Sequence, residues 1–390
     1  MERKIRVLFL PKWYPTPLDP MEGLFIRYQA EALTPFCDVA VISVHPDPEC
    51  AGTFGVAFSE ENEVRVLRVS YRPGEQSWSF LRNVTDYMRL YRANMKAVRS
   101  IRKFAPDIVH AHILTRMGWI GWRVSRKLNA PLVISEHWSR YFPANGTYKG
   151  IFRKWLTSFI VRKASAVVAV SGPLKEAMLR CGLKNPVFRV IPNVVDTSVF
   201  RPRETDKSRG IKTLVHISCF EDKSKNISGF LRSIKALSGL RKDFRCLMVG
   251  DGPDRDDLEA YAASLGILDS FVTFTGLKTG EELVNILQDA DFSVLSSRYE
   301  TFGTVVIESL ACGVPVVSTR VGVALEVIGE TNGLLVPPDD EKALTEALNR
   351  MADCCRDFDR MAIHHDLPGS FTPGSVGKQL FKLYQDLIGV

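Results

Sequence analysis

Two glutamates, Glu300 and Glu308, stand eight positions apart in the segment SSRYETFGTVVIESLACGVPVV, which spans 296–317. Between them lie Gly303 and a Val-Val-Ile run, which a solvent-exposed helix normally avoids. The pattern therefore predicts a packed helix that carries its carboxylates for a purpose. Ionised carboxylates only accept hydrogen bonds, so a pair of them suits the vicinal hydroxyl groups of a polyol.

The residues around the glutamates predict a strand, a loop and a helix in that order. DFSVLSS (291–297) is expected to be a strand, RYETFG (298–303) its carboxyl-terminal loop, and Thr304–Cys312 a helix closed by Gly313. The free amides at the start of this helix form an anion site, and a glycine there lets a phosphate approach the backbone. These amides belong to Thr301, Phe302, Gly303 and Thr304. A phosphate flanked by two polyol-binding carboxylates indicates a nucleotide sugar.

The whole chain repeats the strand–helix alternation twice. The chain has 390 residues, of which 45% are apolar. This length exceeds that of one ordinary hydrophobic core and suits two domains. Short apolar runs alternate with helical segments up to about position 200, and the alternation restarts after the polar stretch RPRETDKSRG (201–210). We expect two doubly wound α/β domains that face each other across a cleft, lined by loops at the carboxyl ends of parallel strands.

Charge is distributed unevenly between the two halves. Residues 1–200 hold 29 Lys and Arg against 16 Asp and Glu, whereas residues 201–390 hold 22 against 28. Much of the positive excess lies in two basic amphipathic segments, 80–104 and 148–165, which are typical of a membrane-surface or anionic-ligand face. An ordinary solvated helix face is the alternative. No nucleic-acid recognition motif accompanies the charge, so nucleic acid is not expected as a partner.

Targeting and cysteine patterns add two expectations. No apolar run approaches the roughly 20 residues that cross a bilayer. The N-terminal segment MERKIRVLFLPKW contains an apolar run that is too short for a signal peptide. We therefore expect a cytoplasmic protein, peripheral on the inner face of a membrane if the basic segments bind lipid. The eight cysteines lack C-x-x-C spacing, so neither disulfides nor bound zinc is expected.

Longer stretches of the chain carry a family resemblance. RYETFGTVVIESLACGVPVVSTRVGVALEVI and NGLLVPPDD resemble the E-x7-E signature of retaining glycosyltransferases of family 4, which have the GT-B fold. Other segments earlier in the chain also resemble family motifs, and they occur in the order that the family has. These segments are PKWYPTPLDPMEGLFIRYQAEAL, DIVHAHI, ISEHWS, AVSGPLKEAM, VIPNVVDTSVF, MVGDGP and FTGLKTGEEL. The resemblance implies an acceptor-binding domain over 1–200, a nucleotide-sugar domain over 201–370, and a last helix over 371–390 that crosses back to the first domain.

The resemblance also implies roles for single residues. Glu300 would bind donor sugar hydroxyls, Glu308 the ribose, and the amides of Thr301 to Gly303 the sugar and diphosphate. Lys225, in FEDKSKNISGF, matches the cation that neutralises the diphosphate, against the alternative of a solvated loop lysine. The implied catalytic set is His137, Glu300 and Lys225. Further donor contacts are implied for Thr304, Gly23, Gly276, Leu277 and Lys278. His112 would line the acceptor side, while His110 suits a structural role.

Three positions depart from the family pattern. The first loop has Glu22-Gly23 where Gly-Gly is common, and Asn193 to Asp196 read Asn-Val-Val-Asp instead of Asn-Gly-Val-Asp. Cys219 stands where many members place a phosphate-binding arginine. Part of the phosphate charge is therefore expected to be met by other residues.

The implied reaction transfers a glycosyl group from a nucleotide diphosphate sugar to an acceptor hydroxyl with retention, and needs no cofactor or metal. Two Asp-x-Asp strings, at 254–256 and 289–291, are better explained by helix ends than by a metal site. The acceptor is expected to be a lipid-linked saccharide or another glycan in surface polysaccharide or glycolipid assembly, with a small soluble acceptor as the alternative. A nucleotide-sugar epimerase or hydrolase of the same fold also stays open. A dinucleotide-dependent oxidoreductase would need G-x-G-x-x-G after the first strand, which is missing.

Overall fold

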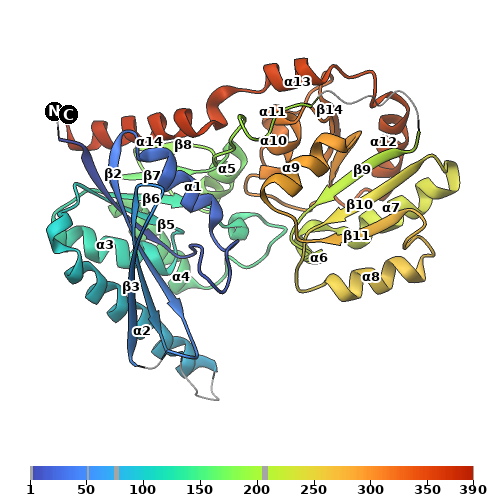
Figure 1. The fold of residues 1–390 in the computed structure, drawn as a ribbon. Helices are drawn as coiled ribbons and strands as arrows, with labels where there is room; N and C mark the ends of the chain where they lie inside the picture. Colours follow the sequence, from blue (N-terminus) through green and yellow to red (C-terminus); the bar gives the residue numbers. More distant parts are fainter. Residues whose placement is uncertain (1–2, 51, 74–78, 204–209, 390) are drawn as a thin grey trace.

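The computed structural model describes residues 3–50, 52–73, 79–203 and 210–389. It consists of two α/β domains side by side, each with a central sheet covered by helices (Figure 1). Residues 204–209, which belong to the expected link between the domains, lie outside the described residues.

The first sheet has eight strands in the order β3-β4-β2-β1-β5-β6-β7-β8. All neighbours pair in parallel except β3 and β4, which form an antiparallel hairpin at one edge. The order reverses between β1 and β5, which makes this the switch point of a doubly wound sheet. The strands are β1 (Ile5–Pro11), β2 (Cys37–Pro46), β3 (Phe54–Glu61), β4 (Val64–Tyr71), β5 (Ile108–His112), β6 (Leu132–Glu136), β7 (Ala166–Ala169) and β8 (Phe188–Val190).

The second sheet has six strands, all parallel, in the order β11-β10-β9-β12-β13-β14. Its switch point lies between β9 and β12, and the predicted site residues Lys225 and Glu300 follow these two strands. The strands are β9 (Lys212–Ile217), β10 (Phe244–Val249), β11 (Val272–Gly276), β12 (Phe292–Leu295), β13 (Val316–Thr319) and β14 (Gly333–Val336).

Helices cover both faces of the first sheet because alternate side chains of each central strand point to opposite faces. Leu8 and Leu10 of β1 pack with α2 (Ser79–Ser100), α3 (Arg116–Leu128), α4 (Ile151–Lys163) and α5 (Gly172–Arg180). Val7 and Phe9 pack on the other face with α1 (Leu24–Leu33) and α14 (Pro373–Ile388). The short 3₁₀ turns η1 (Arg102–Phe104) and η2 (Ser139–Tyr141) complete this domain.

The second sheet is covered in the same way. One face packs against α7 (Ile227–Leu240), α8 (Arg255–Ser264) and α12 (Glu341–Cys354), and the other against α9 (Gly280–Asp289). The remaining elements lie at the sheet ends or lead back to the first domain; they are α6 (Asp222–Lys225), α10 (Thr304–Ala311), α11 (Ala324–Val327), α13 (Arg360–Asp366) and η3 (Gly369–Phe371).

The last helix, α14, returns to the first domain and lies along it (Figure 1). Phe381 of α14 stacks on Phe36 with ring centroids 5.6 Å apart. Tyr384 is fully buried, and its hydroxyl is 2.7 Å from Nδ1 of His110. The sequence prediction of two doubly wound domains with a C-terminal helix crossing back is confirmed.

The edge hairpin β3–β4 is the main element that the sequence analysis did not predict. Its turn residues Asn62 and Glu63 both have positive φ, 47° and 65°, which is the geometry of a two-residue hairpin turn. The alternation in VRVLRVSY, with Val64 and Val66 buried and Arg65 exposed, was an available signal for it.

Two further features bear on the expected location of the protein. All eight cysteines are free thiols. Among the described residues, no helix is both long enough and apolar enough to cross a membrane.

Candidate active site

A cavity of about 390 Å³ lies between the two domains at the carboxyl ends of their strands. Four predicted site residues line it, namely His137 from the first domain and Lys225, Glu300 and Thr301 from the second. The other lining residues are Trp13, Trp138, Ser139, Arg140, Asn145, Thr147, Cys219, Glu221, Lys223, Ser224 and Tyr299. The structure thus brings the predicted catalytic set to one interdomain cavity.

Lys225 and Glu300 form an ion pair in this cavity. Lys225 Nζ lies 2.5 Å from Glu300 Oε1, and Ser297 Oγ donates to the same oxygen at 2.8 Å. The two side chains are only 16% and 11% exposed. Burial alone would lower the pKa of Lys225, but the charge and hydrogen bond of Glu300 outweigh it and raise that pKa above its usual value. Lys225 is therefore protonated near pH 7, and its ammonium group faces the cavity beside Glu300.

The loops that carry this pair are fixed by hydrogen bonds between them. Ser296 Oγ donates to the carbonyl of Lys225 at 2.8 Å. Arg298 holds the Lys225 loop through 2.6 Å bonds to the Asp222 carbonyl and to Asn226 Oδ1, and it is also paired with Asp339. Arg298 therefore has a positioning role, because its donors are taken by protein acceptors.

Helix α10 begins beside Glu300 with an uncapped N-terminus. Its N-cap residue, Gly303, has φ 89° and offers no side chain to the first-turn amides. The neighbouring Gly322 is required by close packing, since a Cβ there would lie 2.4 Å from the Phe302 carbonyl oxygen. Thr301 also contacts the first domain, because Ser171 Oγ donates to its carbonyl at 2.5 Å. Free amides at a rigid helix N-terminus stabilise a bound anion.

Glu308 lies one turn inside α10 and is partly buried. Burial raises its pKa to about 7, and no described residue gives its carboxylate an ion pair or hydrogen bond. It faces α1 across the cleft, since its charge raises the pKa of Tyr28. Glu308 does not line the 390 Å³ cavity itself.

The remaining predicted donor contacts also lie outside that cavity. Gly276 ends β11 with φ 72°, Leu277 is half exposed, and Lys278 is paired with Glu282 at 3.2 Å. Gly23 caps α1 with φ 69°, and a Cβ there would lie 2.3 Å from the Trp13 carbonyl oxygen. Glycine at position 23 is therefore required by the close approach of the two loops.

Three histidines stack behind the cavity. His110 is satisfied at both ring nitrogens, by Tyr384 and by Ser135 Oγ at 2.8 Å. His112 Nδ1 lies 3.3 Å from His137 Nε2, while His112 Nε2 has no described partner. Burial lowers the pKa of His110 and of His137 to about 3, and that of His112 well below its usual value. These rings are neutral near pH 7, which suits hydrogen bonding more than proton transfer.

Glu136 organises the first-domain wall and was not singled out from the sequence. One oxygen accepts from the amides of His137 and Trp138, and the other accepts from the Leu114 amide and the Tyr141 hydroxyl. Its position directly before His137, at the end of a strand, is the signal that could have identified it.

The two Asp-x-Asp strings are used by the fold. Asp254 accepts from the amide of Asp222, and Asp289 pairs with Arg203. Asp291 accepts from the Thr213 amide and pairs with Arg356. Three of the four carboxylates in these strings, those of Asp254, Asp289 and Asp291, are thus engaged with protein donors.

Two facing α/β domains, with a helix N-terminus and an ion pair at the switch point of the second sheet, are the architecture of a GT-B glycosyltransferase. Two family models match the chain, described as Glycosyltransferase Family 4 over residues 24–199 and as Glycosyl transferases group 1 over residues 211–354. The chain belongs to glycosyltransferase family 4 and is an enzyme that transfers glycosyl groups. The resemblance seen in its motifs is confirmed.

Individual proteins agree with this assignment. The putative teichuronic acid biosynthesis glycosyltransferase of Bacillus subtilis is 27% identical over 364 residues, covering 89% of each chain. The sucrose-phosphate synthase of Thermosynechococcus elongatus superposes with a TM-score of 0.79 at 21% identity, covering 99% of this chain and 100% of that one. An Anabaena protein solved with UDP and glucose has a TM-score of 0.76 at 18% identity, covering 98% and 100%. These two structures share the fold.

Proposed function

We propose that the protein is a retaining glycosyltransferase that moves a sugar from a nucleotide diphosphate sugar to a hydroxyl of a lipid-linked saccharide. The observation that carries this proposal is the Lys225–Glu300 pair beside the uncapped N-terminus of α10, in a cavity shared by both domains. The similarity to a protein named for teichuronic acid biosynthesis supports an acceptor from surface polysaccharide assembly.

The proposed chemistry follows from where charge develops. As the glycosidic bond to the diphosphate breaks, negative charge grows on the leaving phosphate, and Lys225 with the α10 amides would stabilise it. Positive character develops on the sugar ring, and Glu300 would hold the sugar hydroxyls in place. Glu308 would accept hydrogen bonds from the ribose. His137, neutral and at the cavity wall, would contribute a hydrogen bond to the sugar.

We further propose that transfer requires no metal ion. Asp254, Asp289 and Asp291 of the Asp-x-Asp strings are engaged with protein donors, and Lys225 would supply the positive charge that a metal would otherwise supply at the diphosphate. Transfer measured with and without EDTA tests this directly, and loss of activity that Mg²⁺ or Mn²⁺ restores would overturn it.

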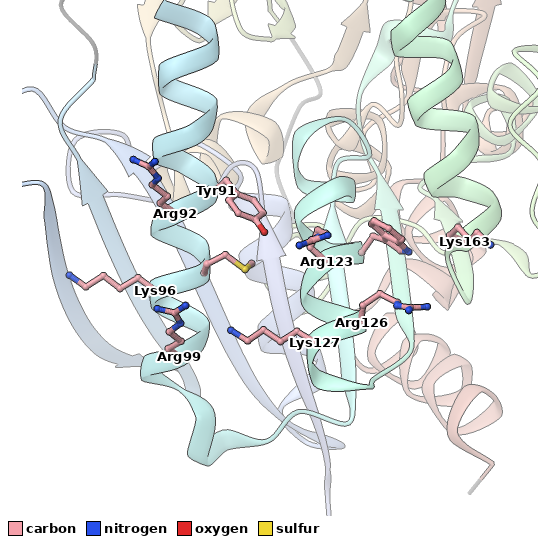
Figure 2. A pocket seen from close by; sticks show the side chains of 10 residues that line it. Tyr91, Arg92, Lys96, Arg99, Arg123, Arg126, Lys127 and Lys163 are labelled. Carbon is pink, nitrogen blue, oxygen red and sulfur yellow. The ribbon is translucent and has the colours of Figure 1, made fainter.

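A basic groove on the first domain supports a membrane-bound acceptor. This groove, of about 870 Å³, is lined by Tyr91, Arg92, Met95, Lys96, Arg99, Trp122, Arg123, Arg126, Lys127 and Lys163. Figure 2 shows these side chains coming from α2, α3 and the end of α4, with Lys127 reaching from α3 toward α2. Seven of them are cations, and none forms an ion pair with a described residue. Each such cation near an anionic bilayer contributes about 1 kcal/mol of attraction.

An aromatic ridge extends from this groove along α4. Ring contacts link Trp122 to Phe159, Phe159 to Trp155, and Trp155 to Phe152, with centroids 5.3, 5.8 and 6.0 Å apart. Phe152 and Trp155 are 72% and 56% exposed, which is unusual for a folded surface. Exposed aromatic side chains beside cations match the interfacial region of an anionic membrane.

Three measurements test the proposed function. A thermal-shift panel with UDP, GDP and ADP sugars should identify one stabilising donor. Mass spectrometry with lipid-linked and soluble acceptors should then detect the glycosylated product, and NMR of that product should show the retained anomeric configuration. Sedimentation with phosphatidylglycerol vesicles should capture the protein at low salt and lose it at high salt. Equal capture at both salt concentrations, or none, would favour a soluble acceptor. Free sugar or epimerised donor without acceptor would indicate a hydrolase or epimerase.

A further inference from the structure

The first-domain wall of the interdomain cavity holds a group of cations that the proposed chemistry does not use. Lys12 follows β1, and its Nζ lies 3.7 Å from the ring centroid of Trp138 and 4.3 Å from that of Trp13. Arg140, in η2, places its guanidinium carbon 3.4 Å from the Trp138 centroid. Both cations lie too close to the Trp138 centroid to share one face of the ring, so they lie on its opposite faces. Trp13, Trp138 and Arg140 line the same cavity as Lys225 and Glu300, whereas Lys12 does not line it.

These cations lack a matching anion. Neither Lys12 nor Arg140 forms an ion pair with any residue in the described parts of the chain. Arg140 is only 6% exposed; its Nη1 donates to Thr115 Oγ1 at 2.9 Å, and its Nε has no hydrogen-bond partner. The nearby Glu136 accepts four hydrogen bonds from other groups, so its oxygens are already engaged.

Electrostatics show the same imbalance. The pKa of Lys12 falls to about 8, chiefly because of burial and then because of repulsion from Arg140 and Arg116. Glu136 and Glu22 oppose this shift without cancelling it. A buried, incompletely bonded guanidinium is unfavourable unless a ligand supplies acceptors, and an oxyanion is the group that fits an arginine with a second cation nearby.

We propose that Arg140, held against Trp138, binds an oxyanion of the acceptor saccharide, and that Lys12 on the opposite face of Trp138 adds positive charge behind this site, so that the enzyme selects an acceptor that is charged close to its reacting hydroxyl. The donor diphosphate already has its own cation and helix terminus in the second domain, so this separate wall is available to the acceptor. The exposed parts of Trp13 and Trp138 suit the apolar face of a sugar ring. The inference rests on the proposed transferase function and names its acceptor class.

The shared chemistry is an oxyanion, which a sugar phosphate or a uronic acid could supply. Calorimetry on the full chain, saturated with the nucleoside diphosphate that the donor panel identifies, separates the two. Glucose 1-phosphate and glucuronate serve as anionic probes, and glucose is the neutral comparison. We expect at least one anion to bind on the order of ten-fold more tightly than glucose, consistent with a charged hydrogen bond. Equal binding of all three overturns the inference.

Variants locate the site. Arg140→Gln should reduce binding of the preferred anion about ten-fold or more, because it removes a charged hydrogen bond. Lys12→Gln should reduce it by a smaller factor, because Lys12 acts through its charge from the other face of Trp138. Lys103→Gln is the matched control, because it removes an exposed lysine in η1, ahead of the amino end of β5. Arg140→Lys keeps the charge if the glutamine variant fails to fold, and it should retain part of the affinity. Anion binding unchanged in Lys12→Gln and Arg140→Lys would overturn the assignment.

Failure of this inference can be told apart from failure of the proposed function. If a neutral acceptor is glycosylated with the same kcat/KM as its phosphorylated or uronic counterpart, transferase activity stands and acceptor selection by charge does not. If no nucleotide sugar binds, the proposed function fails, while direct binding of the anionic probes at Lys12 and Arg140 still tests the site itself.

Discussion

The two walls of the interdomain cavity differ in whether their charged side chains have an ionic partner. On the second-domain wall, Lys225 is matched by Glu300, and both loops are fixed by hydrogen bonds. On the first-domain wall, Lys12 and Arg140 lack an ionic partner among the described residues, and the histidines beside them are neutral. A matched pair is preorganised before substrate arrives, whereas an unmatched group gains its partner only when a ligand binds.

The largest expected effect comes from breaking the matched pair. Glu300→Gln should nearly abolish transfer, with kcat/KM falling about 100-fold or more, because a charged hydrogen bond to the sugar is lost and Lys225 is left unpaired. Lys225→Ala should weaken nucleoside diphosphate binding by a similar factor. Initial rates and calorimetry measure the two effects.

Fold stability provides the control for that prediction. In the double variant Lys225→Ala/Glu300→Gln, the loss of thermal stability should be smaller than the sum of the two single losses, because neither buried charge is left alone. Unchanged turnover in Glu300→Gln together with unchanged nucleotide affinity in Lys225→Ala would end the assignment of the donor site.

A second prediction concerns Glu308 of α10, whose carboxylate has no ion pair or hydrogen bond with a described residue. Its pKa of about 7 in the folded protein lies above its ordinary 4.5. The folded state therefore holds a proton that the unfolded chain has released, so this contribution to stability is present below pH 4.5 and is lost as pH rises to 7. Donor affinity should instead rise as pH rises to 7, because ribose hydroxyls hydrogen-bond best to the ionised carboxylate.

The Glu308→Gln variant tests both halves of this prediction. Its melting temperature should exceed that of the parent at pH 8 and differ little at pH 4.5. Its donor affinity should be about ten-fold weaker at pH 8. A parent enzyme whose donor affinity shows no change between pH 6 and pH 8 would contradict the expected role of Glu308.

The fold and the second-domain wall were readable from the sequence because their signals are local. Glu300, Gly303 and Glu308 lie within nine residues, and the helix that they define has the predicted start. The first-domain wall depends on residues far apart in the chain, since Lys12 and Arg140 meet only through the Trp138 ring. No regular spacing in the sequence predicts that these distant residues lie close together in the fold. The β3–β4 hairpin was missed for a different reason, because its turn is Asn-Glu and lacks the glycine typical of tight hairpins.

A third prediction uses pH to probe the unmatched wall. Lys12, with a pKa of about 8, loses its charge as pH rises past that value, whereas glucuronate keeps its charge throughout. Glucuronate binding should therefore weaken several-fold between pH 7 and pH 9, because Lys12 loses its one proton over this range. The groups acting on Lys12 are Arg140, Arg116, Glu136 and Glu22. In Lys12→Gln this pH dependence should disappear, and its persistence would assign the titration to another group.

The smallest expected effect concerns an added cation on the second-domain wall, where Lys225 is already paired with Glu300. Cys219 is exposed, lines the cavity with Lys225 and Glu300, and stands where many family members carry an arginine. The protein atoms around its sulfur reduce its solvation and raise the pKa of its thiol, so it brings no negative charge to the diphosphate. Arg298, one candidate for replacing the missing arginine, is held by Asp339 and by the Lys225 loop. Lys223 lines the cavity and is the nearer substitute.

Cys219→Arg should therefore tighten nucleoside diphosphate binding about three- to ten-fold, since an arginine fork adds a charged hydrogen bond while Lys225 and Lys223 repel it in part. Cys219→Ser is the matched control and should leave the affinity unchanged. Lys223→Gln in the arginine background separates the two effects: if Lys223 already meets the diphosphate, removing it should cost affinity in the parent and less in Cys219→Arg. Weaker binding in Cys219→Arg than in the parent would show that the diphosphate charge is already fully matched on this wall, which would make the contrast with the first-domain wall sharper.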